Sequence, residues 1–171
     1  EVFPDVARND EPQREVFELW AYTIYEISTA GDPVFIARMG TLRLMEEIGL
    51  APSFDSCVAC RKAMEGPQAF SFREGGLLCR EDTRQVREET LIHLSGGATA
   101  LFRHLMNAPL NRLYRFSASE SIRAESAALT DRWVEEKMEK RYNRLALLEQ
   151  TPGFLTIQRK NKEVVGREEE E

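Results

Sequence analysis

Residues 57–82 read CVACRKAMEGPQAFSFREGGLLCRED, and this stretch decides what kind of domain the chain forms. It opens with Cys57 and Cys60 and closes with Cys79 and Asp82, and two residues separate the members of each pair. Two tight turns that present side chains at this spacing can fill the corners of a tetrahedral zinc site with little strain. Asp82 replaces a fourth cysteine, and carboxylate oxygen is an accepted but uncommon ligand in structural zinc sites. We therefore expect a zinc knuckle with Cys57, Cys60, Cys79 and Asp82 as ligands.

Two other interpretations of the cysteines remain open. A degenerate knuckle that has lost its metal, and is held by packing and hydrogen bonds, would leave the same residues. Cys57 and Cys60 could instead cycle between dithiol and disulfide, which usually needs a CxxC motif that opens a helix after a strand. Residues 51–56 read as an irregular exit from a helix, which disfavours redox chemistry. His93 could replace Asp82 as a ligand only if its own predicted helix folded over the knuckle.

The sequence between the two pairs predicts a short hairpin. Residues 70–72 and 77–79 have strand character, and Gly75 and Gly76 supply the turn. Strands this short are not stable alone in water, so a metal or the adjacent helices must hold them. We expect a small insertion over residues 52–82 in which the hairpin aromatics pack against the knuckle.

Two helices are predicted before the insertion. Over residues 14–28 apolar side chains recur at three- and four-residue steps, the period of an amphipathic helix. These positions are Val16, Phe17, Leu19, Trp20, Ile24 and Ile27. Asp32 can cap a second helix and Pro33 suits its first position, so this helix should run to about Ile48 and stop at Gly49. We expect the two helices to pack antiparallel.

Helical character is also predicted after Asp82. The apolar positions are Leu91, Leu94, Leu101 and Leu105, with Gly96 and Gly97 as a break. Ser117 and Glu120 have capping-box spacing at the head of a long helix that should continue to about Gln150. The expected fold class is mainly α, a helical bundle with a small zinc-knuckle and β-hairpin insertion.

Composition places the chain among ordinary globular proteins. It has 171 residues, 42% of them hydrophobic, which is enough to bury a core. No apolar run approaches the roughly 18 residues of a membrane span, so we expect a cytosolic protein without a membrane partner. Glu1 stands where an initiator Met would be, so we expect a piece of a longer protein. Residues 158–171, which end in the run Glu168–Glu171, should form a disordered charged tail.

The order of these features resembles one family. The sequence passes from a helix to IGLAP at 48–52, then to the first cysteine pair, to Phe70 and Ser71, and to GGLLC at 75–79. This order is similar to the helical C-terminal region of the RecO family of bacterial recombination mediators, over roughly residues 14–150. The resemblance implies a single helical domain over residues 1–171 with a zinc-finger-like insertion at 52–82. Two features differ from the family: Asp82 stands where metal-binding members usually carry a cysteine, and the family's N-terminal OB-fold barrel is absent from this sequence.

The resemblance also implies a function. The full protein would act in DNA repair and homologous recombination, bind single- and double-stranded DNA, and anneal complementary strands. It would engage the acidic C-terminal tail of the single-stranded-DNA-binding protein and work with RecR to load recombinase. It would have no catalytic residues, and it would work in the bacterial cytoplasm at the nucleoid. Because an OB fold is a natural platform for single strands, we expect this chain to contribute mainly architecture and partner docking.

A cluster of arginines is the candidate contact surface for DNA or an acidic tail. It is interleaved with His104, Tyr114 and Phe116, and only Glu120 offsets it locally. Its members are Arg103, Arg112, Arg115 and Arg123. The alternative is that these arginines pair with nearby acids while Tyr114 and Phe116 belong to the core.

Two functions of other classes compete with the mediator. One is a thiol-redox or metal-dependent enzyme whose active site is the cysteine cluster. The other is a zinc-ribbon scaffold that makes no contact with nucleic acid. The state of the thiols and the metal content separate these alternatives from a structural zinc site.

Overall fold

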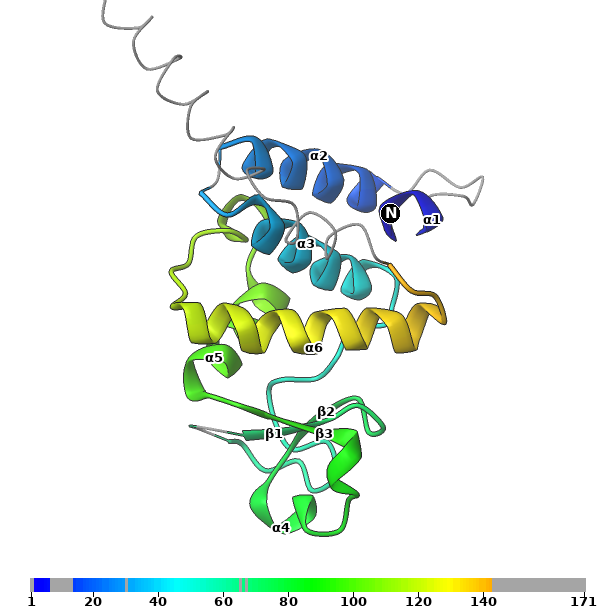
Figure 1. The fold of residues 1–171 in the computed structure, drawn as a ribbon, viewed down its shortest axis with the longest axis vertical. Coiled ribbons are helices and arrows are strands. Elements are labelled where there is room, and N and C mark those ends of the chain that lie inside the picture. Colours follow the sequence, from blue (N-terminus) through cyan, green and yellow to red (C-terminus); the bar gives the residue numbers. More distant parts are fainter. Residues whose placement is uncertain (1, 7–13, 30, 65, 67, 143–171) are drawn as a thin grey trace, which may run out of the picture.

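The fold is described from a computed structural model, which covers residues 2–6, 14–29, 31–64, 66 and 68–142. It is mainly α-helical and carries one small antiparallel sheet, as the sequence predicts. Figure 1 shows α2, α3 and α6 lying side by side, with the sheet and α4 beyond α6 at one end of the molecule. We call the first part, together with α5, which packs against α3 and α6, the helical layer, and the second part the knuckle end. The helices are α1 (Val2–Val6), α2 (Arg14–Thr29), α3 (Pro33–Glu47), α4 (Arg80–Thr83), α5 (Gly96–Asn107) and α6 (Glu120–Met138), with 3-10 turns η1 (Glu88–Thr90) and η2 (Leu110–Arg112).

Helices α2 and α3 form as the sequence predicts. Asp32 caps α3, because its Oδ1 accepts a hydrogen bond from the Phe35 amide at 3.0 Å. Gly49 follows the helix with a φ of +76°, a left-handed conformation that suits glycine. Figure 1 shows α2 and α3 running in opposite directions, which confirms the antiparallel packing. The structure adds α1, which the sequence pattern did not predict.

The apolar residues of α2 divide between two faces. Val16 and Leu19 are buried against the core together with Thr23. Four other apolar side chains of the helix are exposed: Phe17 (63%), Trp20 (42%), Ile24 (46%) and Tyr25 (62%). The predicted helix is therefore correct, but its apolar stripe is wider than the face that this chain covers.

The sheet contains one strand more than the sequence predicts. Its order is β2-β1-β3, with β1 (Gln68–Ser71) antiparallel both to β2 (Gly76–Leu78) and to β3 (Leu91–Leu94). The prediction of helix at residues 91–94 was wrong, and so was the placement of His93 on a helix. Gly96 and Gly97 open α5 rather than breaking a helix, and Ser95 caps it by accepting from the Ala98 amide at 3.2 Å. Leu91 and Leu94 have helical spacing, but pairing with the free edge of β1 decides their conformation.

The last described helix is shorter than predicted at both ends. It begins after Ser119, whose Oγ accepts from the Ile122 amide at 3.4 Å, and not at Ser117. It ends at Met138, because Glu139 adopts a left-handed conformation with a φ of +51°. Residues 143–150 of the predicted helix and the predicted tail at 158–171 lie outside the described residues.

An aromatic cluster joins the knuckle end to the helical layer. The Phe54 ring stacks on Phe102 of α5, with 4.7 Å between centroids. Phe70 of β1 packs edge-on against Trp133 of α6, and the Trp133 indole donates a hydrogen bond to the Leu50 carbonyl at 2.9 Å. Phe70 and Phe72 are buried, which confirms that the hairpin aromatics are packing residues. The core is thus continuous from α3 to the sheet.

Among the described residues, no helix combines the length and apolarity that crossing a membrane requires.

Candidate metal centre and cationic surfaces

Two turns from different parts of the chain build the candidate metal centre. The first carries Cys57 and Cys60 and is closed by hydrogen bonds from the Cys57 amide to the Lys62 carbonyl and from the Arg61 amide to the Cys57 carbonyl, both 2.9 Å. The Val58 amide donates to the Leu77 carbonyl at 2.9 Å, so this turn is fixed to β2. The second turn is the start of α4, where Cys79 caps the helix and Asp82 lies within its single turn. The hairpin therefore determines how the two turns meet.

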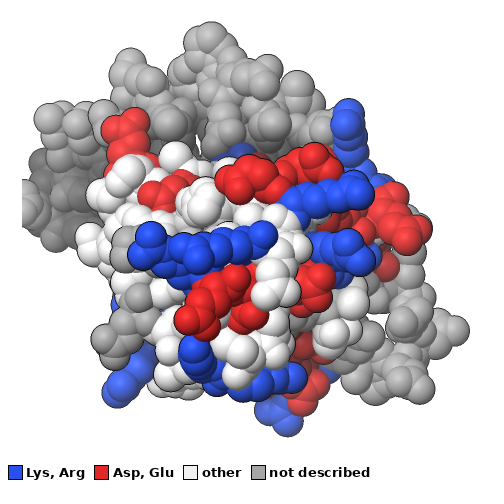
Figure 2. All heavy atoms as spheres, turned by 90° about the horizontal axis from the view of Figure 1, so that it is seen from below, with Lys and Arg blue, Asp and Glu red and all other residues white. Residues whose placement is uncertain are grey.

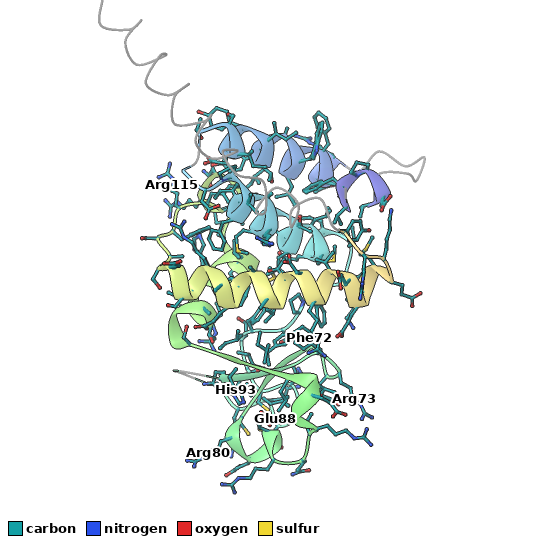
Figure 3. All side chains as sticks on the ribbon, viewed as in Figure 1. Phe72, Arg73, Arg80, Glu88, His93 and Arg115 are labelled. Atoms are coloured by element: carbon teal, nitrogen blue, oxygen red, sulfur yellow. The ribbon has the colours of Figure 1, made fainter. Side chains whose placement is uncertain are left out.

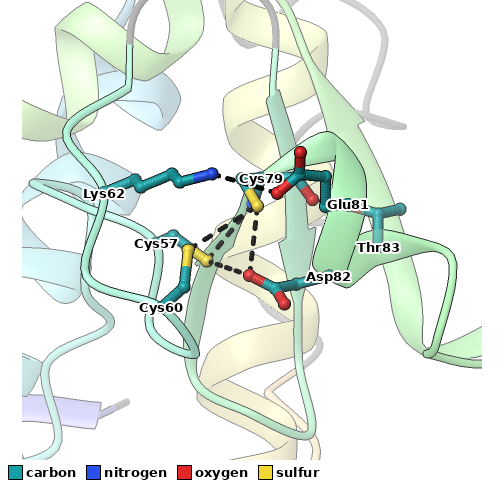
Figure 4. A network of polar contacts seen from close by, with 7 residues as sticks. All are labelled: Cys57, Cys60, Lys62, Cys79, Glu81, Asp82 and Thr83. Carbon is teal, nitrogen blue, oxygen red and sulfur yellow. Dashed lines mark hydrogen bonds and ion pairs between the residues drawn. The ribbon is translucent and has the colours of Figure 1, made fainter.

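The four predicted ligands come together. One ligand atom from each of Cys57, Cys60, Cys79 and Asp82 lies within 4.8 Å of the others (Figure 4). The sulfurs of Cys60 and Cys79 are 3.7 Å apart. A tetrahedral zinc ion with Zn–S bonds of about 2.3 Å would place two sulfurs ~3.8 Å apart. The donor set and its spacing therefore fit a zinc-sized cation, as the sequence predicts.

The carboxylate of Asp82 lies close to two of the three thiols. Its Oδ2 accepts from the Cys57 thiol at 3.1 Å and from the Cys79 thiol at 3.0 Å. A zinc ion would hold a carboxylate oxygen and a sulfur about 3.5 Å apart. Binding a metal therefore requires Asp82 to withdraw by only about half an ångström, with the thiol protons leaving.

The cluster shifts the acidity of its members in different directions. Hydrogen bonds from the thiols of Cys79, Cys60 and Cys57 lower the pKa of Asp82, so the carboxylate is charged. Burial raises the pKa of the Cys57 thiol, but backbone N–H donors at Cys60, Cys79 and Ala59 outweigh it, and the net pKa is below its usual value. For Cys60, the Lys62 backbone donor lowers the pKa, whereas Asp82 and the other thiols raise it more, to about 12. The two members of the first cysteine pair therefore differ, because the pKa of the Cys57 thiol is lowered and that of the Cys60 thiol is raised.

Two contacts outside the ligand set support the centre. The Cys79 amide donates to the Cys57 sulfur at 3.3 Å, a contact that stabilises a thiolate ligand. Lys62 pairs with Glu81 at 3.0 Å and so links the two turns across the cluster (Figure 4). Cys57 is buried while Cys60 is exposed, so the centre lies at the surface with one side closed by the hairpin.

The surroundings of the cysteine pair differ from those of a redox motif. Cys57 and Cys60 lie in a turn, and no helix starts at either residue. The sulfur of Cys57 is also buried beneath the second turn. His93 is on β3, where its Nε2 lies 3.2 Å from the Glu88 carboxylate, and it is not in the ligand group. The local structure thus favours a metal knuckle.

Two arginines of the predicted basic cluster have intramolecular partners. Arg103 on α5 donates to the Phe54 carbonyl and to the Met64 carbonyl, both at 2.7 Å, and so ties the helix to the start of the insertion. Arg123 on α6 pairs with Asp32 at 2.8 Å and lies over the Phe35 ring. The Arg123 contact matches the alternative in which these arginines pair with acids, whereas Arg103 bonds to backbone carbonyls instead.

The other two arginines, Arg112 and Arg115, are exposed in the connection between α5 and α6. His104 fastens this connection, because its Nε2 lies 3.1 Å from the Arg112 carbonyl and 3.2 Å from the Leu113 carbonyl. Tyr114 packs inward, and its hydroxyl is 2.6 Å from that of Thr23. Of the four predicted cations, Arg103 and Arg123 thus make contacts within the fold, and Arg112 and Arg115 are exposed on the connection.

A comparison with protein families identifies the family of the chain. The family model described as "Recombination protein O C terminal" matches residues 4–146. The chain belongs to the RecO C-terminal family. The match includes the cysteine-bearing hairpin and the helical layer with its long helix α6.

Curated relatives support the same family. "DNA repair protein RecO" of Acetivibrio thermocellus is 27% identical over 146 residues, which is 85% of this chain and 57% of the relative. The protein of the same name from Lactobacillus delbrueckii subsp. bulgaricus is 34% identical over 110 residues, covering 64% of this chain and 43% of the relative. That from Desulfitobacterium hafniense is 25% identical over 151 residues. The chain spans about half the length of the curated relatives it matches. No solved structure matches the chain significantly.

Sequence reasoning missed one group of surface cations. Arg61, Arg80 and Arg84 lie at the knuckle end, far from the predicted basic cluster in sequence. All three are exposed. The signal that could have found them is their position beside the cysteine pairs, since Arg61 follows Cys60 and Arg80 follows Cys79.

Proposed function

We propose that this chain is the helical C-terminal part of a bacterial recombination mediator that acts in DNA repair and homologous recombination. The observation that carries the proposal is the family match over residues 4–146. The whole protein would bind and anneal DNA, mainly through the family's N-terminal OB fold, and would load recombinase together with RecR. This chain would contribute architecture and partner docking and no catalysis.

A structural zinc ion is part of this proposal. Cys57, Cys60, Cys79 and Asp82 would hold it, and it would supply a covalent cross-link between the first turn and α4. Because the strands of the hairpin are three or four residues long, such a link would contribute directly to the folding of the knuckle end. The chain's own residues position the ligands through the Val58 and Cys57 backbone hydrogen bonds.

Partner docking is proposed for the exposed pair Arg112 and Arg115. The acidic C-terminal tail of the single-stranded-DNA-binding protein would present carboxylates to these guanidinium groups, which form charge-assisted hydrogen bonds with such groups. The pair is exposed, whereas the nearby Arg103 and Arg123 make contacts within the fold, which supports Arg112 and Arg115 as the part of the predicted cluster that docks a partner. The compartment that fits this role is the bacterial cytoplasm, at the nucleoid.

A peptide titration tests the docking proposal. A fluorescein-labelled peptide that ends in an acidic tail should bind the chain, and R112E/R115E should weaken that binding by about tenfold or more, because each lost charge-assisted contact costs about 1.5–3 kcal/mol. R61E/R80E is the matched control, since it makes the same change of charge at the knuckle end and should leave the affinity within about twofold. Equal binding by the wild type and R112E/R115E would remove this pair from the docking surface.

A further inference from the structure

The knuckle end carries three arginines that the proposed function does not use. In Figure 3 Arg80 lies at the α4 end of the molecule, whereas Arg115 lies at the opposite end, beside the helical layer. Figure 2 looks onto the α4 end and shows Lys and Arg side chains spread across it, with acidic side chains between them. Arg61, Arg80 and Arg84 belong to this end by sequence and fold, so they form a cationic group separate from Arg112 and Arg115.

The cysteine cluster brings together the two chain segments that carry Arg61 and Arg80. Arg61 follows Cys60 and Arg80 follows Cys79, and the sulfurs of those cysteines are only 3.7 Å apart. The neighbouring pair Lys62 and Glu81 joins the same two segments at 3.0 Å. Arg84 continues the turn of α4 with helical backbone angles, so it lies four residues from Arg80 on the same face.

The acidic side chains of the knuckle end that have a partner pair with groups other than these three cations. Glu81 pairs with Lys62, and Asp82 faces the thiols of the cluster. Arg87 pairs with Glu89 at 3.6 Å, and Arg73 with Glu74 at 3.7 Å. Within the described part of the chain Arg61, Arg80 and Arg84 have no ion-pair partner, and all are exposed. Three exposed guanidinium groups at one end of the molecule favour an anionic partner.

The chemistry of the surface selects among polyanions. The exposed large apolar side chains of the described residues are all on α2, and none is at the knuckle end. A protein partner usually inserts an apolar or aromatic anchor into its interface, whereas a phosphate backbone requires only placed cations. Side chains four residues apart on a helix have Cβ atoms about 5–6 Å apart, and long arginines at that spacing can reach successive phosphates.

We propose that Arg61, Arg80 and Arg84 form a contact for the sugar-phosphate backbone of DNA, which reads charge and not sequence. The inference rests on the proposed role in DNA repair and adds a substrate contact that the helical layer does not supply. The contact is auxiliary, because three phosphates provide weak affinity, so the division of labour with an OB fold stands. Duplex DNA should bind at least as well as single strands, because its charge density is higher and this surface carries no exposed aromatic ring for base stacking.

A salt titration with the chain tests this contact. Anisotropy of a labelled oligothymidine should report weak binding whose log affinity falls with log salt at a slope of about −2, since three single-strand phosphates contribute ~0.7 each. Between 50 and 200 mM salt this slope means about a 16-fold loss. R61Q/R80Q/R84Q should weaken binding at 50 mM by about tenfold or more and bring the slope close to zero. R14Q/K137Q/R141Q, a charge-matched control at exposed positions of α2, α6 and the segment after α6, should keep the slope.

Each other outcome overturns the assignment. A slope that survives in R61Q/R80Q/R84Q, or no measurable binding by the wild type at 50 mM salt, would remove DNA from this surface. Loss of the slope in the control variant would instead place the contact on the helical layer. An acidic peptide that binds the three arginines more tightly than the oligonucleotide would identify a protein partner. None of these results bears on tail binding by Arg112 and Arg115, so the proposed function fails or stands separately.

Discussion

The helical layer and the knuckle end are held together by different forces. In the helical layer, side chains from distant helices interlock: Arg38 of α3 pairs with Asp131 of α6 at 2.9 Å, and Arg43 donates to the Leu105 and Met106 carbonyls of α5. At the knuckle end the elements are short, and the Cys57–Asp82 cluster crosses between them. The difference indicates that the first part is stable through packing, whereas the second depends on what fills the cluster.

The largest effect should come from removing a ligand. Cys57→Ser replaces a buried thiol that lies within reach of the Asp82 carboxylate and the Cys79 amide. Metal binding should be lost, and with it several kcal/mol of the stability of the knuckle end, because the binding energy of a structural zinc is folding energy. Hydrogen exchange should show lost protection over residues 68–78 and retained protection in α3.

A matched control separates the loss of a ligand from the effect of changing any buried residue of the knuckle end. Ser71→Ala alters a buried residue of β1 that is not a ligand. It should leave metal binding intact. If residues 68–78 and α3 both lose protection in Cys57→Ser, the two regions fold as one unit and the contrast between them fails.

The next effect concerns the joint between the two regions. Phe102→Ala removes the ring that stacks on Phe54 at 4.7 Å and leaves a cavity in a fully buried site. We expect a loss of about 3–5 kcal/mol in the free energy of unfolding, measured by urea denaturation of the metal-loaded protein. Phe17→Ala in the exposed face of α2 is the control and should cost less than about 0.5 kcal/mol. Similar losses in the two variants would show that the aromatic cluster does not join the regions.

Arg103→Gln should have an intermediate effect on the same joint. It removes the donors to the Phe54 and Met64 carbonyls, for which we expect about 2–3 kcal/mol. Arg112→Gln, in the connection that follows the same helix, should change the stability by less than about 0.5 kcal/mol. Thermal melts of both variants with metal bound make the comparison. If Arg103→Gln leaves the thermal stability unchanged, Arg103 does not hold the joint and belongs with the candidate binding cations that the sequence predicts.

The smallest effect lies within the helical layer and depends on pH. Burial raises the pKa of Tyr114 well above its usual value of about 10, although the Thr23 hydroxyl lowers it in part. The folded state therefore holds this proton more tightly than the unfolded chain, so the stabilisation is complete below pH 10 and declines as the pH rises above it. Tyr114→Phe should cost about 1 kcal/mol at pH 7 through the lost contact with Thr23.

Denaturation curves at pH 8 and pH 11 test this sign. The wild type should lose more stability between these values than Tyr114→Phe does. Equal losses would mean that Tyr114 ionises as freely in the folded protein as in the unfolded chain.

The sequence predicts features that local spacing controls. Asp32 and Gly49 mark the ends of α3 because capping depends on neighbouring residues, and the two cysteine turns show in their spacing for the same reason. Strand β3 could not be found in this way, since its partner β1 lies more than 15 residues earlier and Leu91 and Leu94 have helical spacing. The sequence allows pairing of Arg103 and Arg123 within the fold but cannot name the partners Phe54, Met64 and Asp32, because these are distant in sequence.

The same limit applies to exposure. Phe17 and Trp20 fit the apolar period of α2 as well as Leu19 does, yet only Leu19 is buried. Periodicity gives the helix but cannot say how much of its apolar stripe the rest of the chain covers. The candidate site was predictable from its spacing because all its ligands come from two short turns, and the surface arginines were not, because their pairing depends on the tertiary fold.

The most direct test of the contrast between the two regions is elemental analysis of the purified chain, combined with thiol titration before and after chelation. We predict one equivalent of zinc per chain, thiols that react only after the metal is removed, and a helical layer that stays protected from hydrogen exchange in the chelated protein. A metal-free chain with a protected hairpin, or a Cys57 thiol that reacts at neutral pH while zinc is bound, would contradict it.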